Sequence, residues 1–226
     1  MPLTIAIDGP VGAGKSTISD AVAQRLGILH LDTGAMYRAV GLCALQMGID
    51  PRDEEAVCRL CREDGAQVDV RYENGAQITL LNGRDVSGLI RTQEVGGAAS
   101  AVSQYPSVRK MLVQRQQDMA KDRPMLLDGR DIGTVVLPNA TLKIFLTATA
   151  EARATRRMLQ LREKGDETPF EDILAEVNAR DYQDTHREAD PLRQAPDAVL
   201  VDSSDLTFEE TVNEILRLAR KAEAMA

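Results

Sequence analysis

The segment Gly9–Thr17 reads GPVGAGKST and lies between an apolar run, LTIAID, and a stretch with a helical pattern. It matches the spacing G-x-x-x-x-G-K-[ST] of a phosphate-binding loop. In such a loop, successive backbone N–H groups and the N-terminus of the following helix surround phosphate oxygens. The pattern therefore predicts a nucleoside triphosphate site. A glycine turn of purely structural purpose is the alternative.

Two side chains of this loop have specific expected roles. Lys15 is predicted to reach the β- and γ-phosphates, and Ser16 is predicted to bind Mg²⁺. The residues expected to contact the triphosphate are Gly9, Pro10, Val11, Gly12, Ala13, Gly14, Lys15, Ser16 and Thr17.

Outside the loop, short apolar runs of β type alternate with helical patterns. The runs at 3–8, 28–32, 125–128, 142–146 and 198–202 read as strands that are buried on both faces. Helical patterns lie near 15–26, 35–47, 53–63, 94–120, 150–164, 170–187 and 207–222. This alternation predicts a single α/β domain over 1–226, in which a five-stranded parallel sheet is flanked by helices.

Two regions interrupt that alternation. Residues 68–88 alternate apolar and polar side chains and contain Asn-Gly at 74–75 and 82–83. These features predict a small three-stranded antiparallel meander inserted in the parallel core. Residues 162–169, REKGDETP, form a charged break between two helical patterns and are a candidate mobile lid.

Composition narrows the class of protein. The 226 residues are 43% hydrophobic, which is enough to bury a sizeable core, and the net charge of −8 argues against nucleic-acid or anionic-membrane partners. No signal peptide or membrane span is apparent, and Cys43, Cys58 and Cys61 without an export signal indicate a reducing cytoplasm. The C-x-x-C at Cys58 and Cys61 fits two buried residues on a helix better than a metal or redox site.

The apolar run 125–128 ends in Asp128 and Gly129. Asp128 is predicted to hold Mg²⁺ through water, yet no glutamate follows it as a base for hydrolysis. The guanine-reading tetrapeptide Asn-Lys-x-Asp is also absent from the sequence. These features favour a kinase over a GTPase switch or a motor ATPase.

Three arginines immediately before the candidate lid form a cluster. Arg153, Arg156 and Arg157 share one helix face at i, i+3 and i+4, so their charges repel unless an anion lies among them. We therefore predict that they stabilise the phosphoryl group during transfer, as arginines delivered by closure do. A solvated basic face partnered by Glu151 or Glu163 is the alternative.

Other polar residues are ambiguous when taken singly. Thr33 follows the second strand and is expected to cap the next helix, whereas Arg38 and Arg109 are anion-binding candidates that also fit surface charges. The spacing of Arg180, Asp184 and Arg187 suits a surface salt-bridge ladder.

Taken together, these residues resemble the bacterial cytidylate kinases over nearly the full chain. The resemblance is carried by IAIDGPVGAGKST, LDTGAMYRA, DVSGLIRTQEVGGAAS, PSVRKMLVQRQ, LDGRDIGTVVLPNATLKIFLTA, RRMLQLREKG and ARDYQDTHR. It implies a P-loop nucleoside monophosphate (NMP) kinase core with an NMP-binding region at about 35–105 that includes the 68–88 insert, and a short lid at about 150–170. The implied reaction transfers the ATP γ-phosphoryl group to CMP and dCMP, with Mg²⁺ as cofactor, in a cytoplasmic monomer.

The resemblance also implies which residues bind CMP. They are Thr33, Arg38, Ser100, Arg109, Arg130, Asp131, Arg180, Asp184 and Arg187. Cytosine carries an amino donor at N4 where uracil has an oxygen acceptor, so an Arg130–Asp131 pair is expected to discriminate between the two bases. Arg38 and Arg109 would hold the CMP phosphate, and Arg180 with Asp184 would contact the sugar.

Two departures from the family pattern bear on these expectations. Thr33 stands where several relatives have serine, and some relatives have a hydroxyl in the loop only at the position of Thr17.

Two rival functions also remain. One is another small-molecule kinase of the shikimate or dephospho-CoA type, and the other is a nucleotide-dependent regulatory switch.

Overall fold

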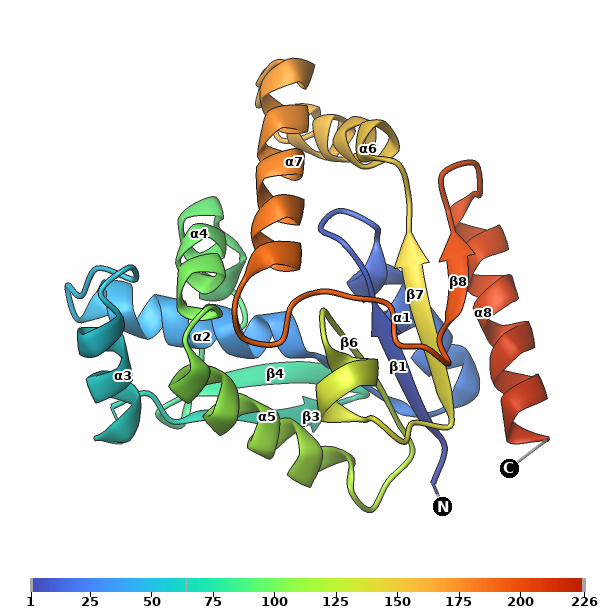
Figure 1. Ribbon diagram of the computed structural model, residues 1–226, viewed down its shortest axis with the longest axis horizontal. Helices are drawn as coiled ribbons and strands as arrows, with labels where there is room; N and C mark the ends of the chain where they lie inside the picture. Colours follow the sequence, from blue (N-terminus) through green and yellow to red (C-terminus); the bar gives the residue numbers. More distant parts are fainter. Residues whose placement is uncertain (1, 64, 225–226) are drawn as a thin grey trace. The chain divides into compact units, whose positions relative to one another are not determined.

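The predicted parallel sheet is present in the computed structural model, which describes residues 2–63 and 65–224. Its five strands are β1 (Thr4–Asp8), β2 (Leu29–Asp32), β6 (Met125–Gly129), β7 (Leu142–Thr147) and β8 (Val199–Asp202), in the order β2-β6-β1-β7-β8 (Figure 1). The β1–β6, β1–β7 and β7–β8 pairs are parallel. The α/β fold with a five-stranded parallel sheet is confirmed.

Burial on both faces, expected for all five strands, is wrong for β8. Val199 and Leu200 are 38% and 55% exposed, whereas the residues of β6 are all buried. β8 forms one edge of the sheet, but β2 forms the other edge and three of its four residues are buried, so edge position alone does not expose a strand.

The chain forms two compact units, Met1–Ile28 with Met125–Ala226, and Leu29–Pro124. In the first unit, α1 (Lys15–Leu26) and α8 (Phe208–Glu223) pack on the sheet through a core that includes Ile7, Val22 and Ile215. Helix α8 begins with a capping box, since the Thr207 hydroxyl accepts from the Glu210 N–H and the Glu210 carboxylate accepts from the Thr207 N–H.

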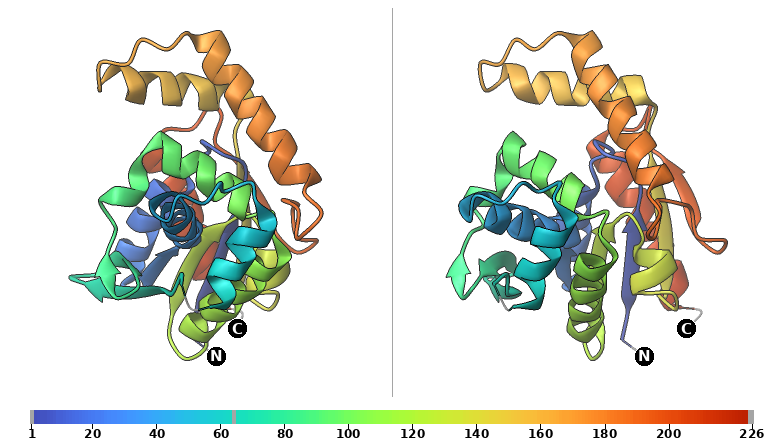
Figure 2. Two further views of the ribbon diagram at one scale, coloured as in Figure 1. Left: turned by 90° about the vertical axis from the view of Figure 1, so that its left-hand side faces the viewer. Right: turned by 60° about the vertical axis from the view of Figure 1, so that its left-hand side comes forward.

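Helices α6 (Ala150–Arg162) and α7 (Phe170–His186) form a hairpin within the same unit. Figure 2 shows them joined at one end by the loop that contains the predicted break. Ala154, Ile173 and Val177 form a small apolar core between the helices, and Val11 of the phosphate-binding loop packs against it.

The second unit contains the whole predicted 35–105 region. Its helices are α2 (Thr33–Gln46), α3 (Glu54–Arg62), α4 (Gln93–Val102) and α5 (Pro106–Ala120), and a 3₁₀ turn spans Leu89–Arg91. The helical pattern at 94–120 is two helices, because Pro106 begins α5 and disfavours a helical residue before it.

The predicted three-stranded meander is also confirmed. Strands β3 (Val68–Glu73), β4 (Ala76–Leu81) and β5 (Arg84–Asp85) form an antiparallel sheet. Both Asn-Gly pairs have positive φ angles at each residue, 52° and 83° at 74–75 and 51° and 76° at 82–83, as tight hairpin turns require. Among the helices that the structure describes, none is long and apolar enough to cross a membrane.

Candidate active site

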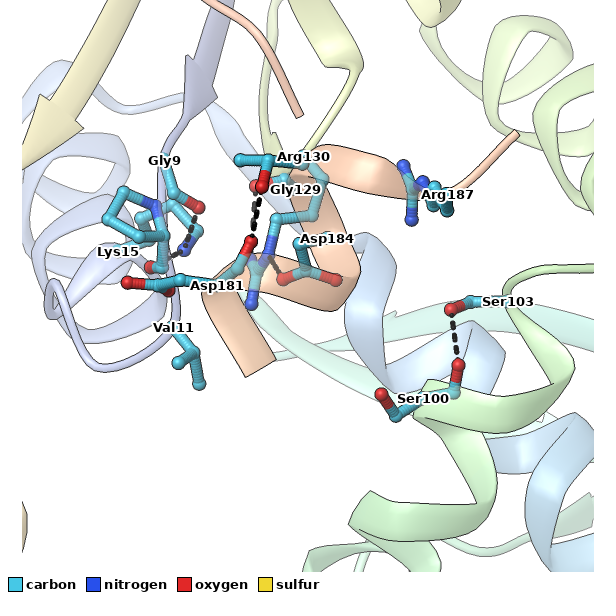
Figure 3. A network of polar contacts seen from close by, with 12 residues as sticks. Gly9, Val11, Lys15, Ser100, Ser103, Gly129, Arg130, Asp181, Asp184 and Arg187 are labelled. Atoms are coloured by element: carbon cyan, nitrogen blue, oxygen red, sulfur yellow. Dashed lines mark hydrogen bonds and ion pairs between the residues drawn. The ribbon is translucent and has the colours of Figure 1, made fainter. Parts of the chain in front are cut away.

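The phosphate-binding loop joins β1 to α1. Gly9, Gly12 and Gly14 have φ angles of 155°, 75° and 82°, and a Cβ on Gly9 would lie 1.9 Å from the Leu146 carbonyl oxygen. Glycine is therefore required at position 9 by close backbone approach. The Lys15 Nζ donates to the carbonyl oxygens of Gly9 and Pro10 at 2.8 and 2.7 Å (Figure 3).

The environment of Lys15 is unusual for a lysine. The residue is 6% exposed, and burial lowers the pKa of its ammonium to about 7, with the positive charge of Arg130 acting in the same direction. A phosphate group beside Lys15 would supply the negative charge that favours the protonated form.

Ser16 and Asp128 come together at the start of α1. The Ser16 hydroxyl donates to Asp128 Oδ2 at 3.0 Å, and Asp128 is 3% exposed. Strand register places Asp128 opposite Ile7, next to the strand that leads into the loop. Hydroxyl and carboxylate oxygens suit Mg²⁺, which takes few protein ligands when phosphates are bound. The described residues hold no cluster of three or more His, Cys, Asp or Glu side chains able to bind a metal. Thr17, by contrast, is exposed.

Asp8 fixes the turn after β6 and was not identified from the sequence. Its carboxylate oxygens accept from the backbone N–H groups of Ile132 and Gly133, both at 2.7 Å. Burial raises the pKa of Asp8 to about 6, although these two hydrogen bonds oppose the rise. A carboxylate at the end of an apolar strand was the available signal, since the same feature identified Asp128.

The segment whose N–H groups Asp8 binds is a π-helical turn after β6, Ile132–Val136. Such segments are rare and are often found at functional sites. Arg130 and Asp131 precede it, at 21% and 7% side-chain exposure.

Arg130 and Asp131 each face helix α7. The Arg130 Nε donates to Asp184 Oδ2 at 2.7 Å (Figure 3). Asp131 Oδ1 lies 3.7 Å from Arg187 Nη2. Burial raises the pKa of Asp184, but the positive charges of Arg130, Arg180 and Arg187 and the hydrogen bond from Arg130 together hold it below the usual range. These ion pairs therefore link Arg130 to α7 and Asp131 to the residue that directly follows α7.

The surface salt-bridge ladder on α7 is a wrong interpretation. Asp184 and Arg187 are 6% and 8% exposed. These two side chains contact Arg130 and Asp131 in the turn after β6. Helical spacing alone could not predict that this side of the helix meets protein. Arg187 directly follows α7 and donates from Nε to the Asp190 carbonyl oxygen at 2.9 Å.

Two of the three arginines predicted to act with the lid, Arg153 and Arg156, have separate partners. Arg153 is 5% exposed and forms a bidentate ion pair with Asp181, and Arg156 donates to the carbonyl and hydroxyl oxygens of Ser203. Arg157 is half-buried. The alternative with Glu151 or Glu163 as partner is thus wrong for Arg153, whose carboxylate partner comes from α7.

Four of the predicted CMP-binding residues lie in the second unit. Asp32, not Thr33, caps α2, because its carboxylate accepts from the Ala35 N–H at 3.0 Å. Thr33 is the first helical residue and is 3% exposed. Ser100 is half-buried on α4, and its carbonyl oxygen accepts from the Ser103 hydroxyl.

Arg109 and Arg38 are held by backbone carbonyl groups. Arg109 is 2% exposed, donates to the Ser103 carbonyl oxygen at 3.1 Å and lies 5.6 Å from the centre of the Tyr37 ring, so it is not a surface charge. Arg38 donates from Nη1 to the carbonyl oxygens of Ile90 and Thr92 at 2.9 and 3.2 Å.

The meander is attached to the end of β2 by Gln77. Its side-chain oxygen accepts from the Asp32 N–H at 2.7 Å, and its amide nitrogen donates to the Asp32 carbonyl oxygen at 3.2 Å. Arg91 adds an ion pair to the Asp32 carboxylate at 3.0 Å. The insert therefore supports the residue that begins α2, a role that the hairpin pattern did not predict.

A family model described as "Cytidylate kinase" matches residues 5–221. The chain belongs to the cytidylate kinase family. It is 49% identical over 219 residues to a cytidylate kinase of Caldicellulosiruptor saccharolyticus, covering 97% of this chain and 96% of the relative. It is 47% identical to a cytidylate kinase of Pasteurella multocida, covering 95% of this chain and 93% of that one.

A solved gluconokinase from Sinorhizobium meliloti 1021 shares the fold, with a TM-score of 0.50 at 16% identity over 99% of this chain and 95% of its own. Family membership makes the chain an ATP-dependent nucleoside monophosphate kinase that phosphorylates CMP. The shikimate-type, dephospho-CoA-type and regulatory-switch alternatives are thereby set aside.

Proposed function

We propose that this cytidylate kinase family member transfers the ATP γ-phosphoryl group to CMP and dCMP through the residues that surround the turn after β6. The observation that carries the proposal is that the buried Asp128 at the end of β6 is followed within three residues by Arg130 and the buried Asp131. This arrangement connects the residues proposed for the metal with those proposed for the base within four positions.

In the proposed ATP site, the residues 9–17 surround the phosphates and Lys15 places its ammonium on the β- and γ-phosphates. Ser16 would bind Mg²⁺ directly and Asp128 through water. When bound, Mg²⁺ would neutralise charge on the transferred phosphoryl group. The hydrogen bond between Ser16 and Asp128 supports this assignment.

In the proposed base site, Asp131 accepts from the N4 amino group of cytosine. The same carboxylate would face the O4 acceptor of uracil, which leaves a buried charge unpaired and disfavours UMP. Arg130 is oriented by Asp184, and Asp131 is oriented by Arg187. Arg180 and Asp184 are proposed to contact the sugar, and Thr33 and Ser100 to contact the nucleotide.

No general base is needed, because the attacking CMP phosphate oxygen is already ionised. Arg38 and Arg109 are proposed to hold that phosphate, while Arg156 and Arg157 are the candidates for contact with the transferred group. Positioning and charge stabilisation then account for catalysis.

A coupled assay of ADP formation tests the proposal. The purified chain with ATP and Mg²⁺ is offered CMP, dCMP, UMP or AMP at equal concentration. ADP is expected to form rapidly with CMP and dCMP and slowly with the other two. Comparable turnover of UMP or AMP would contradict the proposed reading of the base.

The choice of Ser16 over Thr17 for Mg²⁺ gives a separate prediction. Ser16→Ala is expected to raise the Mg²⁺ concentration for half-maximal activity by about tenfold, because a metal ligand is lost. Thr17→Val removes an exposed hydroxyl from the same helix and is the matched control. It should leave the Mg²⁺ concentration for half-maximal activity unchanged. The measurement is initial rate against free Mg²⁺, and the opposite ranking of the two variants would refute the assignment.

Gly96 gives a second prediction, because a Cβ there would lie 3.1 and 3.2 Å from the two terminal nitrogens of Arg38. Gly96→Ala should displace the guanidinium and raise the KM for CMP by about tenfold, with kcat/KM for ATP unchanged. Gly97→Ala is the control, since a Cβ at Gly97 meets nothing within 4 Å on the same helix.

Both glycine-to-alanine substitutions should stabilise the helix by about 1 kcal/mol, so lost helix stability could not explain a higher KM for CMP. Equal KM values for CMP in the two variants would show that the approach of Gly96 to Arg38 is unimportant.

A monomeric state and a cytoplasmic location remain proposals. The first rests on the family resemblance. The second is supported by an ATP-dependent reaction and by the three free cysteines at positions 43, 58 and 61.

A further inference from the structure

Arg153 is held from three directions by partners in the first unit. Its Nε donates to the Ala148 carbonyl oxygen at 2.9 Å, and its Nη1 donates to the Val11 carbonyl oxygen at 2.9 Å. Its Nη1 and Nη2 donate to the two carboxylate oxygens of Asp181 at 3.1 and 2.6 Å. One guanidinium thus joins the phosphate-binding loop, the start of α6 and the middle of α7.

These contacts determine what Arg153 is able to do. Four of the five guanidinium N–H groups are used in the four hydrogen bonds to Ala148, Val11 and Asp181. The side chain of Arg153 is 5% exposed and that of Asp181 is 24% exposed. A direct contact with a transferred phosphoryl group would require several of these bonds to break, so the geometry favours a positioning role.

Apolar packing connects the phosphate-binding loop to helices α6 and α7 in addition to the contacts of Arg153. Val11 packs against the core of Ala154, Ile173 and Val177 between α6 and α7. A Cβ on Gly12 would lie 3.3 Å from the Cβ of Arg153, so this part of the loop lies close to α6. The loop is therefore attached to the α6–α7 hairpin through both the carbonyl group and the side chain of Val11.

Helix α7 also carries residues of the proposed CMP site. Asp181 follows Arg180 directly and lies about one turn before Asp184, whose carboxylate holds Arg130. Figure 3 shows Asp181 and Asp184 on this helix with Val11 and Lys15 of the loop nearby. A shift of Val11 would be transmitted to α7 through the hydrogen bond from Arg153 to Val11 and the bidentate ion pair of Arg153 with Asp181.

We propose that Arg153 and Asp181 form a positioning pair that makes CMP affinity depend on nucleotide occupancy of the phosphate-binding loop. The inference rests on the proposed function, because it assigns Arg180, Asp184 and Arg187 to CMP. Coupling between two sites is a free energy shared by both ligands, so each ligand must strengthen the other by the same factor.

The test is calorimetric titration of CMP, with and without a saturating non-hydrolysable ATP analogue and Mg²⁺. The coupling factor is the ratio of the two CMP dissociation constants. For the natural chain it should be about fivefold or more. In Asp181→Asn, which loses the charge and one acceptor oxygen, it should fall close to one, while CMP binding without the analogue persists.

Glu176→Gln is the matched control. Glu176 is exposed on the same helix, so the natural coupling factor should be retained. If Asp181→Asn unfolds because Arg153 is left as a buried unpaired charge, the double variant Arg153→Met with Asp181→Leu removes both charges and gives the same test.

Each outcome distinguishes the inference from the proposed function. A folded Asp181→Asn or double variant that keeps the natural coupling factor overturns the inference. A coupling factor of one in the natural chain, with CMP bound and phosphorylated, also overturns it and leaves the proposed function intact. Failure of the natural chain to bind or phosphorylate CMP would instead overturn the proposed function.

Discussion

Lys15→Met is expected to lower kcat for CMP phosphorylation by about 10³-fold, because a preorganised donor to the developing phosphate charge is removed. Methionine retains much of the apolar stem of lysine and fits a position that is 6% exposed. Steady-state rates at saturating ATP and CMP are the measurement. The loss should appear in kcat, since the charge acts on the group in transfer.

Lys143→Met is the control for the loss of a buried lysine. Lys143 lies on β7, is 7% exposed and pairs with Asp197 at 2.8 Å. Its replacement should alter thermal stability and leave kcat close to the natural value. A Lys15→Met enzyme that keeps kcat near that of the control would contradict the proposed role of Lys15.

Asp131→Ala is expected to lower kcat/KM for CMP by about 10²-fold or more, because the buried acceptor for the cytosine amino group is lost. ATP binding should persist, since Lys15 is held by loop carbonyl oxygens and Ser16 by Asp128, and neither set of hydrogen bonds involves Asp131. Steady-state kinetics with varied CMP and equilibrium titration with the ATP analogue measure the two effects separately.

Equal loss of CMP turnover and ATP affinity in Asp131→Ala would indicate that the turn supports the whole unit. Its circular dichroism spectrum and melting temperature show whether the substitution has unfolded the protein. An intact fold with normal CMP kinetics would exclude Asp131 from the base site.

Much of the fold could be predicted because the deciding signals are local. The loop at 9–17 and the turns at 74–75 and 82–83 each depend on neighbouring residues, whereas the division of 94–120 into two helices at Pro106 was missed although its signal is also local. The exposure of β8 could not be predicted in this way, since it depends on which distant parts of the chain cover each strand.

For the candidate site too, local signals could be predicted and contacts between distant residues could not. Residue types and spacing identified Lys15 and Asp128, but the pairs Asp8 with Ile132, Arg130 with Asp184 and Arg153 with Asp181 join positions 124, 54 and 28 residues apart. Such partners follow from the packing of α7 and the turn after β6. Helical spacing placed Asp184 and Arg187 on one face and could not say whether that face met solvent or protein.

The role of Asp131 in reading the base is tested by the ratio of kcat/KM for CMP to kcat/KM for UMP, measured in the natural chain and in Asp131→Asn. Asparagine keeps the size of the side chain and adds an N–H donor that can satisfy uracil O4. We expect a large ratio in the natural chain and a much smaller ratio in the variant, because CMP turnover falls while UMP turnover is maintained or improved. An unchanged ratio in a folded Asp131→Asn protein would contradict the claim that the turn after β6 reads the base.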